Sequence, residues 1–419
     1  MEFKEIIKDK ERILLVEPAF PIPCKSRNHK NTFPVGLLKI SSYLKSLGKS
    51  VMFVRMNEEY DFTGIINFDP QFVMVTSIFT YWAKEVKDAV YYFKLLLNAP
   101  IMVGGIFASL LPNNCKEYTK CDIVWTGVIQ EAEKHPIDYS LLDEEIDFQI
   151  LHTTRGCNRT CDFCGCYIIE PQWKYKQTIK DEIIKRKLVF YDNNLIANPY
   201  IDNILDELIE LKKSRSILSC ESQSGFDGRI LLKKPYLAKK LKEAGFKYPK
   251  IAWDGAVSTW ESCEKQLDIL LDAGFNNRNI SVFMLFNHDL DYDELEEKRV
   301  LLFNKRIQVT DCRFRPLDRL EDNYNGRLNS PQTNYDYHIN PNWTDRQVKQ
   351  FRRNVRRHNG CVRYGADWYS ETINRRRISQ EEIYYYRSMD YETVKEHLHD
   401  AWNPAEKFII ETDEQMVLK

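Results

Sequence analysis

Short apolar runs alternate with amphipathic stretches over the first 145 residues. The run Arg12–Glu17 is almost entirely apolar and too short for a buried helix, which is typical of a buried strand. Residues 36–47 carry apolar side chains at helical spacing and end before Gly48, which favours a helix. The same criteria predict strands at 51–55, 72–76, 101–103 and 123–125 and a helix at 83–97. This alternation predicts an α/β fold with a parallel, doubly wound sheet that binds ligands at the carboxyl ends of its strands.

The alternation continues from about residue 146 as six strand–helix units. Helices predicted at 200–213, 235–244, 259–273 and 293–306 lie between six predicted strands, at 148–154, 188–191, 217–220, 250–253, 281–285 and 308–313. Six such units favour a partial barrel over a second flat sheet, and periodicity by itself leaves both open.

Strand signals end near residue 320. Residues 321–343 are rich in Asn, Tyr and Pro, and Thr344 then caps a predicted helix at 345–357 with one apolar face. Residues 339–377 hold ten Lys or Arg and three Asp or Glu, whereas residues 378–419 hold four and ten. We therefore predict three domains, at 1–145, 146–320 and 321–419, of which the last is mainly helical or irregular, with a basic helix and an acidic tail.

Composition excludes several classes of protein. Among 419 residues, 60 Lys and Arg face 61 Asp and Glu, and the net charge of −1 disfavours a protein that binds a polyanion over its whole surface. No apolar run approaches the roughly 18–20 residues of a membrane span, and the charged N-terminus lacks the apolar segment of a signal peptide. The odd number of cysteines, 11, favours reduced thiols in the cytoplasm over a disulfide framework.

The most informative motif is a group of three cysteines directly after the predicted strand at 148–154. Cys157, Cys161 and Cys164 have the spacing C-x3-C-x2-C, and thiolates are soft ligands suited to iron–sulfur clusters or zinc. Structural zinc sites use four ligands, commonly as two C-x2-C pairs, and the chain has no second pair. Ferredoxin-type runs have four cysteines, and Cys166 is poorly spaced to be the fourth. Three ligands on a four-iron cluster leave one iron open to a substrate or cosubstrate; the alternative is three unrelated buried cysteines.

This motif resembles that of the radical S-adenosylmethionine (SAM) superfamily, in which C-x3-C-x-aromatic-C holds a [4Fe–4S] cluster after the first strand of a partial (β/α)6 barrel. The aromatic position is Phe163, and the resemblance covers about residues 146–320. It implies that SAM chelates the fourth iron and that reduction of the cluster cleaves SAM to a 5′-deoxyadenosyl radical. It also implies an electron donor such as flavodoxin or ferredoxin.

Polar residues at the ends of the later strands become candidates for binding SAM. Asp192 follows the second strand and is similar to the family position that holds the SAM amino group; the other candidates are Phe163, Glu221, Ser222 and Asp254, the last for the ribose hydroxyls. Each could instead be solvated or cap the next helix. The fifth and sixth strands end at Asn287 and His288 and at Arg313, Arg315 and Asp318.

The first block resembles the cobalamin-binding, Rossmann-type domain that is fused to one radical SAM class. The resemblance is carried by residues 33–38, 77–80 and 103–109, and the implied contacts to cobalamin are Ser77, Thr80, Gly104, Gly105, Ala108 and Ser109. Glycines at a strand end let the backbone approach a flat ligand. The chain has no D-x-H-x-x-G, so no histidine of that motif can bind cobalt from below. The domain could also be a scaffold without a cofactor, and Phe20, Phe79 and Phe107 could fill the gap that a corrin needs.

Two further groups of residues suggest other functions. Cys24, Cys115 and Cys121 could hold a second cluster, as in methylthiotransferases, or be ordinary thiols, which we favour. The predicted basic helix, with nearby aromatic side chains, could bind nucleic acid; we favour a solvated helix that pairs with the acidic tail. The basic residues are Arg346, Lys349, Arg352, Arg353, Arg356 and Arg357, and the aromatic ones are Tyr335, Tyr337, Trp343, Tyr364 and Trp368.

Together these observations predict an enzyme that cleaves SAM reductively at a [4Fe–4S] cluster and uses cobalamin to methylate an unactivated carbon. A radical rearrangement or dehydrogenation without methyl transfer is the alternative within the superfamily. A cluster-bearing protein that binds nucleic acid without catalysis is the alternative outside it. The substrate is expected to be a small molecule or of nucleotide type, and no membrane partner is expected.

Overall fold

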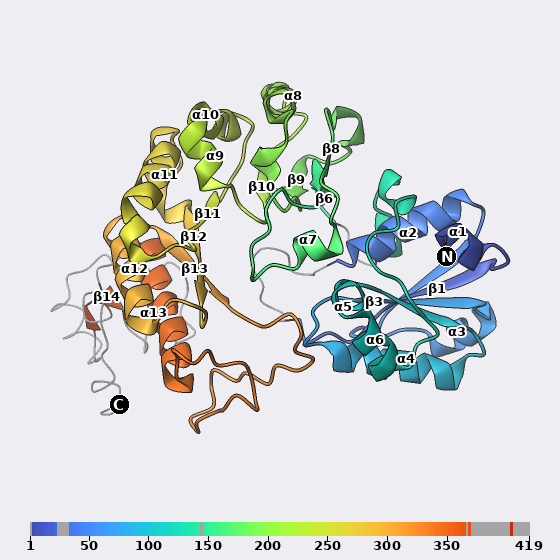
Figure 1. Cartoon of the computed structure of the whole chain (residues 1–419). Coiled ribbons are helices and arrows are strands. Elements are labelled where there is room, and N and C mark those ends of the chain that lie inside the picture. The colour runs from blue at the N-terminus through green and yellow to red at the C-terminus, as the bar shows by residue number, and fades with distance from the viewer. Residues whose placement is uncertain (1, 23–32, 143–145, 366–367, 370–402, 405–419) are drawn as a thin grey trace, which may run out of the picture. The chain divides into compact units, whose positions relative to one another are not determined.

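The computed structural model describes residues 2–22, 33–142, 146–365, 368–369 and 403–404, and the chain forms two compact units (Figure 1). The first unit comprises Met1–Ile150, Thr154–Lys174 and Arg315–Tyr324. The second comprises Leu151–Thr153, Tyr175–Phe314 and Asn325–Lys419. Among the described residues, no helix has the length and hydropathy that a membrane span requires.

The first unit is built on a parallel five-stranded sheet, as the alternation of the sequence predicts. Its order is β2-β1-β3-β4-β5, with strands β1 (Arg12–Glu17), β2 (Ser50–Arg55), β3 (Phe72–Ser77), β4 (Ile101–Gly105) and β5 (Ile123–Val124). Strand β1 lies between β2 and β3, and its Ile13 pairs with Val51 on one side and Phe72 on the other. Chain order and spatial order therefore differ as they do in doubly wound folds.

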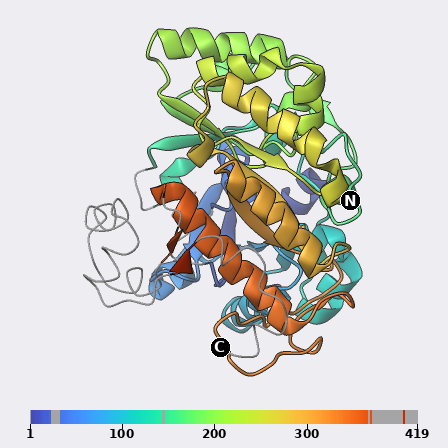
Figure 2. The ribbon, with the colours of Figure 1, turned by 90° about the vertical axis from the view of Figure 1, so that its left-hand side faces the viewer.

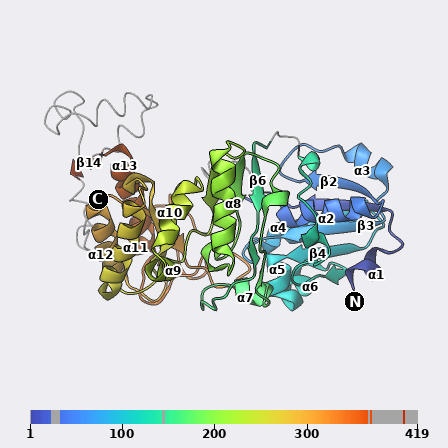
Figure 3. The same ribbon diagram turned by 90° about the horizontal axis from the view of Figure 1, so that it is seen from above.

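Helices cover both faces of this sheet. Along β1, Leu14 and Val16 belong to one hydrophobic core and Ile13 and Leu15 to another, because successive side chains of a strand point to opposite faces. The second core is closed by α1 (Phe3–Ile7) and α2 (Val35–Ser46), and the first by α3 (Phe62–Phe68), α4 (Ala83–Leu96), α5 (Ile106–Leu110) and α6 (Pro112–Thr119) (Figures 1 and 3). Helices α1, α3, α5 and α6 were not predicted, since five to eight residues show too little of a helical period.

All six strands predicted after residue 146 are present. They form two parallel three-stranded sheets, β10-β9-β6 and β11-β12-β13, with strands β6 (Phe148–Leu151), β9 (Lys187–Phe190), β10 (Ser219–Ser222), β11 (Lys250–Ala252), β12 (Ser281–Phe286) and β13 (Gln308–Arg313). Isolated parallel bridges, Cys220 to Phe246 and Phe226 to Ile251, link the β10 and β11 regions. The strands thus follow each other in the order of a partial (β/α)6 barrel, which confirms the predicted fold class.

The helices of the second unit lie outside the arc of strands (Figure 1). They are α8 (Ile201–Lys213), α9 (Gly228–Lys233), α10 (Tyr236–Glu243), α11 (Trp260–Asp272) and α12 (Tyr292–Asn304). In α8, for example, the buried residues Ile201, Ile204, Leu205 and Leu208 recur at helical spacing and face the strands. The short strands β7 (Thr154–Arg155) and β8 (Lys174–Tyr175) pair with each other.

Helix α13 (Asp345–Tyr364) lies beside α12 and is seven residues longer than predicted (Figure 2). A capping box between Thr344 and Gln347 starts it, and Gly365 in a left-handed conformation ends it. The predicted apolar face of Val348, Phe351 and Val355 is buried, and Cys361 and Val362 extend it, so that burial offsets the cost of Gly360 within the helix.

Candidate functional site

The three cysteines of the motif lie on a loop that follows β7 and leads into α7 (Cys166–Ile169). Cys157, Cys161 and Cys164 are partly buried, and none of the ten described cysteines forms a disulfide. The backbone N–H of Cys164 donates to the carbonyl of Cys161 at 3.0 Å, which turns the chain within the loop. Phe163 is also partly buried, and its N–H donates to the carboxylate of Asp162 at 2.9 Å.

The chemistry of these thiols suits a soft metal. A hydrogen bond with the thiol of Cys166 lowers the pKa of Cys164 to about 6 and raises the pKa of Cys166. Thiolates, rather than thiols, are metal ligands, so the lowered pKa favours the form of Cys164 that binds metal. Cys166, whose spacing fits a fourth ligand poorly, is the partner of Cys164 in this hydrogen bond.

Asp192 joins the ends of two neighbouring strands. It follows β9, is fully buried, and its Oδ1 accepts hydrogen bonds from the N–H of Thr153 at 2.9 Å and from its hydroxyl at 2.6 Å. Thr153 lies just beyond β6. The residue predicted to hold the SAM amino group therefore links the carboxyl ends of β6 and β9.

Glu221 and Ser222 lie at the end of β10, where a lysine from β11 meets them. Lys250 is 7% exposed, and its Nζ lies 3.1 Å from the Glu221 carboxylate and 3.4 Å from the carbonyl oxygen of Ser222. The Ser222 hydroxyl donates to the carbonyl of Gly225 at 3.0 Å. Sequence analysis missed Lys250, although a lysine that opens an apolar strand is an available signal because charged side chains are rarely buried without a partner.

Asp254 lies on the exposed loop after β11, and helix α12 holds this loop in place. The ammonium group of Lys298 donates to the carbonyls of Trp253 at 2.9 Å and Gly255 at 2.8 Å. Glu294, one turn earlier, accepts from the N–H of Val257 at 2.7 Å. Burial lowers the pKa of Lys298 to about 8 despite the nearby carboxylates of Asp254 and Glu294. Lys298 is a second residue that sequence analysis missed.

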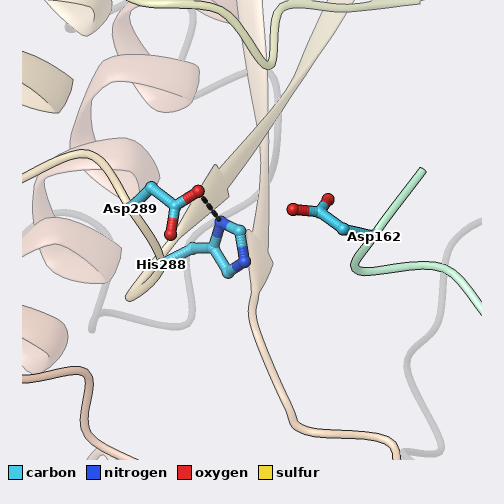
Figure 4. Close-up of side chains that lie close together, drawn as sticks. All are labelled: Asp162, His288 and Asp289. Atoms are coloured by element: carbon cyan, nitrogen blue, oxygen red, sulfur yellow. Dashed lines mark ion pairs between the residues drawn. The ribbon is translucent and has the colours of Figure 1, made fainter.

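The loop after β12 is fixed by Asn287. Its backbone is left-handed, with a φ of 59°, and its buried side chain donates to the carbonyl of His338 at 2.8 Å and accepts from the N–H of Asn340 at 2.9 Å. The next residue, His288, has its Nδ1 3.5 Å from the carboxylate of Asp289 (Figure 4). Phe314 packs against the imidazole edge, with ring centroids 4.4 Å apart.

In the first unit, two serines hold the corner between β3, β4 and α5. The Ser77 hydroxyl donates to the carbonyl of Gly104 at 2.8 Å and accepts from the N–H of Ala108 at 3.1 Å. The Ser109 hydroxyl donates to the carbonyl of Gly105 at 2.6 Å and accepts from a backbone N–H at 2.9 Å. Ser77 and Ala108 are buried, as is Thr80, so these predicted cobalamin contacts also have a role in the fold.

The two glycines of this corner differ in what surrounds them. Gly105 has a φ of 101°, and a Cβ there would lie 2.1 Å from the carbonyl oxygen of Ser77. A larger residue at Gly105 would disrupt the corner with or without a ligand, so the glycine is needed for the backbone itself. At Gly104 a Cβ would meet only Trp125, at 3.8 Å, which is an ordinary contact. Gly104 is therefore the position at which added bulk tests for a ligand.

The three phenylalanines that could block a corrin lie in different environments. Phe20 and Phe107 are buried in the core that contains α4. Phe79 is 41% exposed and stacks on Tyr81, with ring centroids 4.9 Å apart and planes 7° apart. Two of the three are thus core residues of the first unit.

The remaining cysteines fit the interpretation as ordinary thiols. Cys115 and Cys121 are buried in the core of the first unit, where a hydrogen bond between their thiols lowers the pKa of Cys121 to about 6 and raises that of Cys115. Cys24 lies outside the described residues, so the proposal of a second cluster on these three cysteines stays a prediction.

Two basic side chains of the predicted basic helix form ion pairs in the structure. Lys349 pairs with Asp345 at 2.9 Å, and Arg352 pairs with Asp311 at 3.0 Å. Tyr337 and Trp343 are buried and cannot stack on bases, and the side chains of Tyr364 and Trp368 lie outside the described residues, as does most of the acidic tail. Tyr335, at 93% exposed, is the one predicted aromatic that the structure shows at the surface.

A doubly wound sheet, a partial barrel and a three-cysteine loop after its first strand define the class of architecture to which this chain belongs. No family model matches the sequence, and no curated protein matches it. Solved structures do match. TsrM from Kitasatospora setae, a radical SAM methyltransferase with cobalamin and a [4Fe–4S] cluster bound, has 13% sequence identity and a TM-score of 0.57 over 73% of this chain and 76% of that chain.

A second structure of the same enzyme contains its tryptophan substrate and the SAM analogue aza-SAM. It has 14% identity and a TM-score of 0.53 and covers 73% of each chain. At such low identity the likeness shows the fold alone, and it confirms that this chain shares its fold with TsrM.

Proposed function

We propose that the chain is a radical SAM enzyme that methylates an unactivated carbon with the help of cobalamin. The observation that carries the proposal is the loop of Cys157, Cys161 and Cys164 in a chain with the fold of TsrM. Three cysteines in place of four leave one iron of a four-iron cluster for the amino and carboxylate groups of SAM. When bound, the cluster supplies the electron that cleaves SAM, and cobalamin carries the methyl group.

The side chains at the strand ends would bind and orient SAM. In this proposal Asp192 accepts a hydrogen bond from the SAM amino group while Thr153 keeps its carboxylate in place. Asp254 binds the ribose hydroxyls from a loop that Lys298 and Glu294 hold. Phe163, Glu221 and Ser222 complete the set, with Lys250 balancing the charge of Glu221.

The corner of the first unit would hold the corrin. Ser77, Thr80, Ala108 and Ser109 shape this corner, and the space at Gly104 allows close approach of a flat ligand. We also propose a small-molecule or nucleotide-type substrate, reduction by flavodoxin or ferredoxin, and a location in the cytoplasm, where thiols stay reduced.

Anaerobic reconstitution of the full chain with iron and sulfide tests this proposal. We expect one [4Fe–4S] cluster per chain, and the triple change of Cys157, Cys161 and Cys164 to Ala should abolish it. A triple change of Cys220, Cys263 and Cys312 to Ala is the matched control and should leave cluster content unchanged. With dithionite and SAM, 5′-deoxyadenosine or S-adenosylhomocysteine should accumulate.

Two outcomes would contradict the proposal. The first is full cluster content in the triple variant of the motif. The second is the absence of both SAM products together with an electron-paramagnetic-resonance signal of the reduced cluster that SAM does not change.

A further inference from the structure

One carboxylate binds both residues at the start of the cysteine loop. Glu170 follows α7 at the end of the loop, and its Oε2 accepts a hydrogen bond from the N–H of Gly156 at 2.6 Å. Its Oε1 accepts from the guanidinium group of Arg155 at 2.6 Å. Gly156 directly precedes Cys157, so the first ligand of the loop follows a residue that Glu170 holds.

The backbone packs tightly at the same place. Gly156 is buried and has a φ of 74°, and a Cβ there would lie 2.7 Å from the carbonyl oxygen of Gln172 and 2.9 Å from that of Glu170. Real Cβ atoms do not approach a carbonyl so closely. The start and end of the loop are therefore in direct backbone contact, and the Glu170 side chain spans that contact.

A series of ion pairs connects Arg155, at the start of the cysteine loop, to helix α2 of the first unit. The Nε of Arg155 lies 3.4 Å from Glu133, whose carboxylate also pairs with Lys39 of α2 at 3.0 Å. The four side chains are between 10% and 28% exposed, so solvent screens their charges less than at the open surface. The start of the cysteine loop is thus fixed to its own end and to a helix that covers the sheet.

We infer that Glu170 is the positioning residue of the cluster, because it closes the cysteine loop and thereby holds the three thiols in place for iron. The inference rests on the proposed [4Fe–4S] cluster and adds to it a residue that binds no iron. Residues that orient metal ligands commonly contribute 10- to 100-fold to metal affinity. A loop that supplies all three protein ligands depends strongly on such support.

The test is the rate at which reconstituted full-length protein loses its cluster to a chelator, followed by visible absorbance under anaerobic conditions. We expect Glu170→Ala to lose the cluster about 10-fold faster or more than the wild type. Glu170→Gln should be intermediate, because the amide oxygen can still accept from Gly156 while the ion pair with Arg155 is lost. Glu117→Gln removes a negative charge from an exposed position on α6 of the same unit and should leave the rate unchanged.

Gly156→Ala is an independent test that leaves Glu170 intact, and its added Cβ should also accelerate cluster loss. Wild-type rates in both Glu170→Ala and Gly156→Ala would overturn the inference. So would a lower melting temperature of the cluster-free Glu170→Ala protein with an unchanged rate of cluster loss, since that would mark a merely structural role. Failure of the wild type to take up iron and sulfide would instead overturn the proposed function, and this inference with it.

Discussion

Several titratable side chains of the second unit are buried, and each has a hydrogen-bond or ion-pair partner. Glu296 and Arg299 are each 1% exposed, and their carboxylate and guanidinium groups pair at 2.6 Å. Asn354 of α13 donates to the same carboxylate at 3.1 Å. His358 lies nearby, with a ring nitrogen 2.7 Å from the carbonyl oxygen of Ile307. Because burying an unpaired charge costs several kcal/mol, such groups are either paired or neutral.

His358 predicts a dependence of stability on pH. Burial, with help from the neighbouring Arg299, lowers the pKa of this imidazole from 6.5 to about 3. Between these values the unfolded chain binds the proton and the folded chain does not, so stability is fully present above pH 6.5 and falls as pH is lowered towards 3. The loss from this group should approach about 1.4 kcal/mol per pH unit.

The measurement is urea unfolding of the wild type and of His358→Gln between pH 7.5 and 5. The variant should be less stable at pH 7.5 and should lose less stability on acidification. His288→Gln, at a partly exposed imidazole, is the control and should follow the wild-type profile. If the free energy of unfolding falls equally with pH in all three proteins, His358 is not the cause of the loss of stability in acid.

At the scale of elements, side chains of helices α12 and α13 hydrogen-bond to the backbone of a strand-end loop and of an edge strand. Helix α12 holds the loop after β11 through Lys298 and Glu294, and α13 holds the edge strand β13 through Asn359. The Asn359 amide accepts from the N–H of Val309 at 2.8 Å and donates to its carbonyl at 2.7 Å. An exposed edge strand would otherwise leave these backbone groups without a protein partner.

Lys298→Met should weaken SAM binding. The change removes both hydrogen bonds to the carbonyls of Trp253 and Gly255 and frees the loop that carries Asp254. We expect the dissociation constant of SAM at the reconstituted cluster to rise about 10-fold, which corresponds to about 1.4 kcal/mol. Lys305→Met is the matched control, because the ammonium group of this lysine pairs with Glu264 and Asp268 of α11.

A double-variant comparison separates positioning from general damage. If Lys298 acts through Asp254, then Lys298→Met should have little further effect in an Asp254→Asn background. If the losses in SAM-binding free energy of the two single variants add fully in the double variant, Lys298 does not act through Asp254.

At the scale of the whole molecule, each unit presents its candidate residues at the carboxyl ends of parallel strands. In the first unit these are the ends of β3 and β4 and the cysteine loop after β7, and in the second the ends of β9, β10 and β11. This is where α/β proteins bind ligands, because loops and helix N-termini converge there on a rigid sheet. The chain shares its fold with TsrM, whose structure contains cobalamin and a [4Fe–4S] cluster, and two cofactors are proposed for this chain for that reason.

Cobalamin binding is tested at Gly104. Hydroxocobalamin should bind the wild type, as followed by its visible spectrum, and Gly104→Val should raise the dissociation constant by about 10-fold or more while leaving the melting temperature near that of the wild type. The spectrum should lack the features of histidine bound below cobalt from the D-x-H-x-x-G motif. Gly105→Ala is the contrast, since it should lower the melting temperature even without cobalamin.

No uptake of cobalamin by the wild type would remove the methyltransferase proposal. A radical rearrangement or dehydrogenation would then become the favoured reaction, because the cysteine motif is independent of the first unit's corner.

The sequence by itself determined the order of strands and helices and the presence of the cysteine loop. Apolar periodicity and turn residues act over a few neighbouring positions, so β1, α4, α8 and β13 could be predicted almost to their ends. The three cysteines of the metal-binding motif lie within a few positions of one another, so their spacing could also be recognised in the sequence. The short helices α1, α3, α5 and α6 were missed because they show too little of a period.

Only the tertiary structure decided which side chains support the candidate sites. Lys298 meets the β11 loop across 45 positions of chain, and Lys250 meets Glu221 across 29. No local pattern singled out Glu170, which the fold brings to Gly156. Gly105 was expected to leave space for a ligand. The structure shows in addition that a side chain there would collide with the carbonyl oxygen of Ser77 at the end of β3. Such contacts depend on how elements pack, and packing joins residues that no local pattern relates.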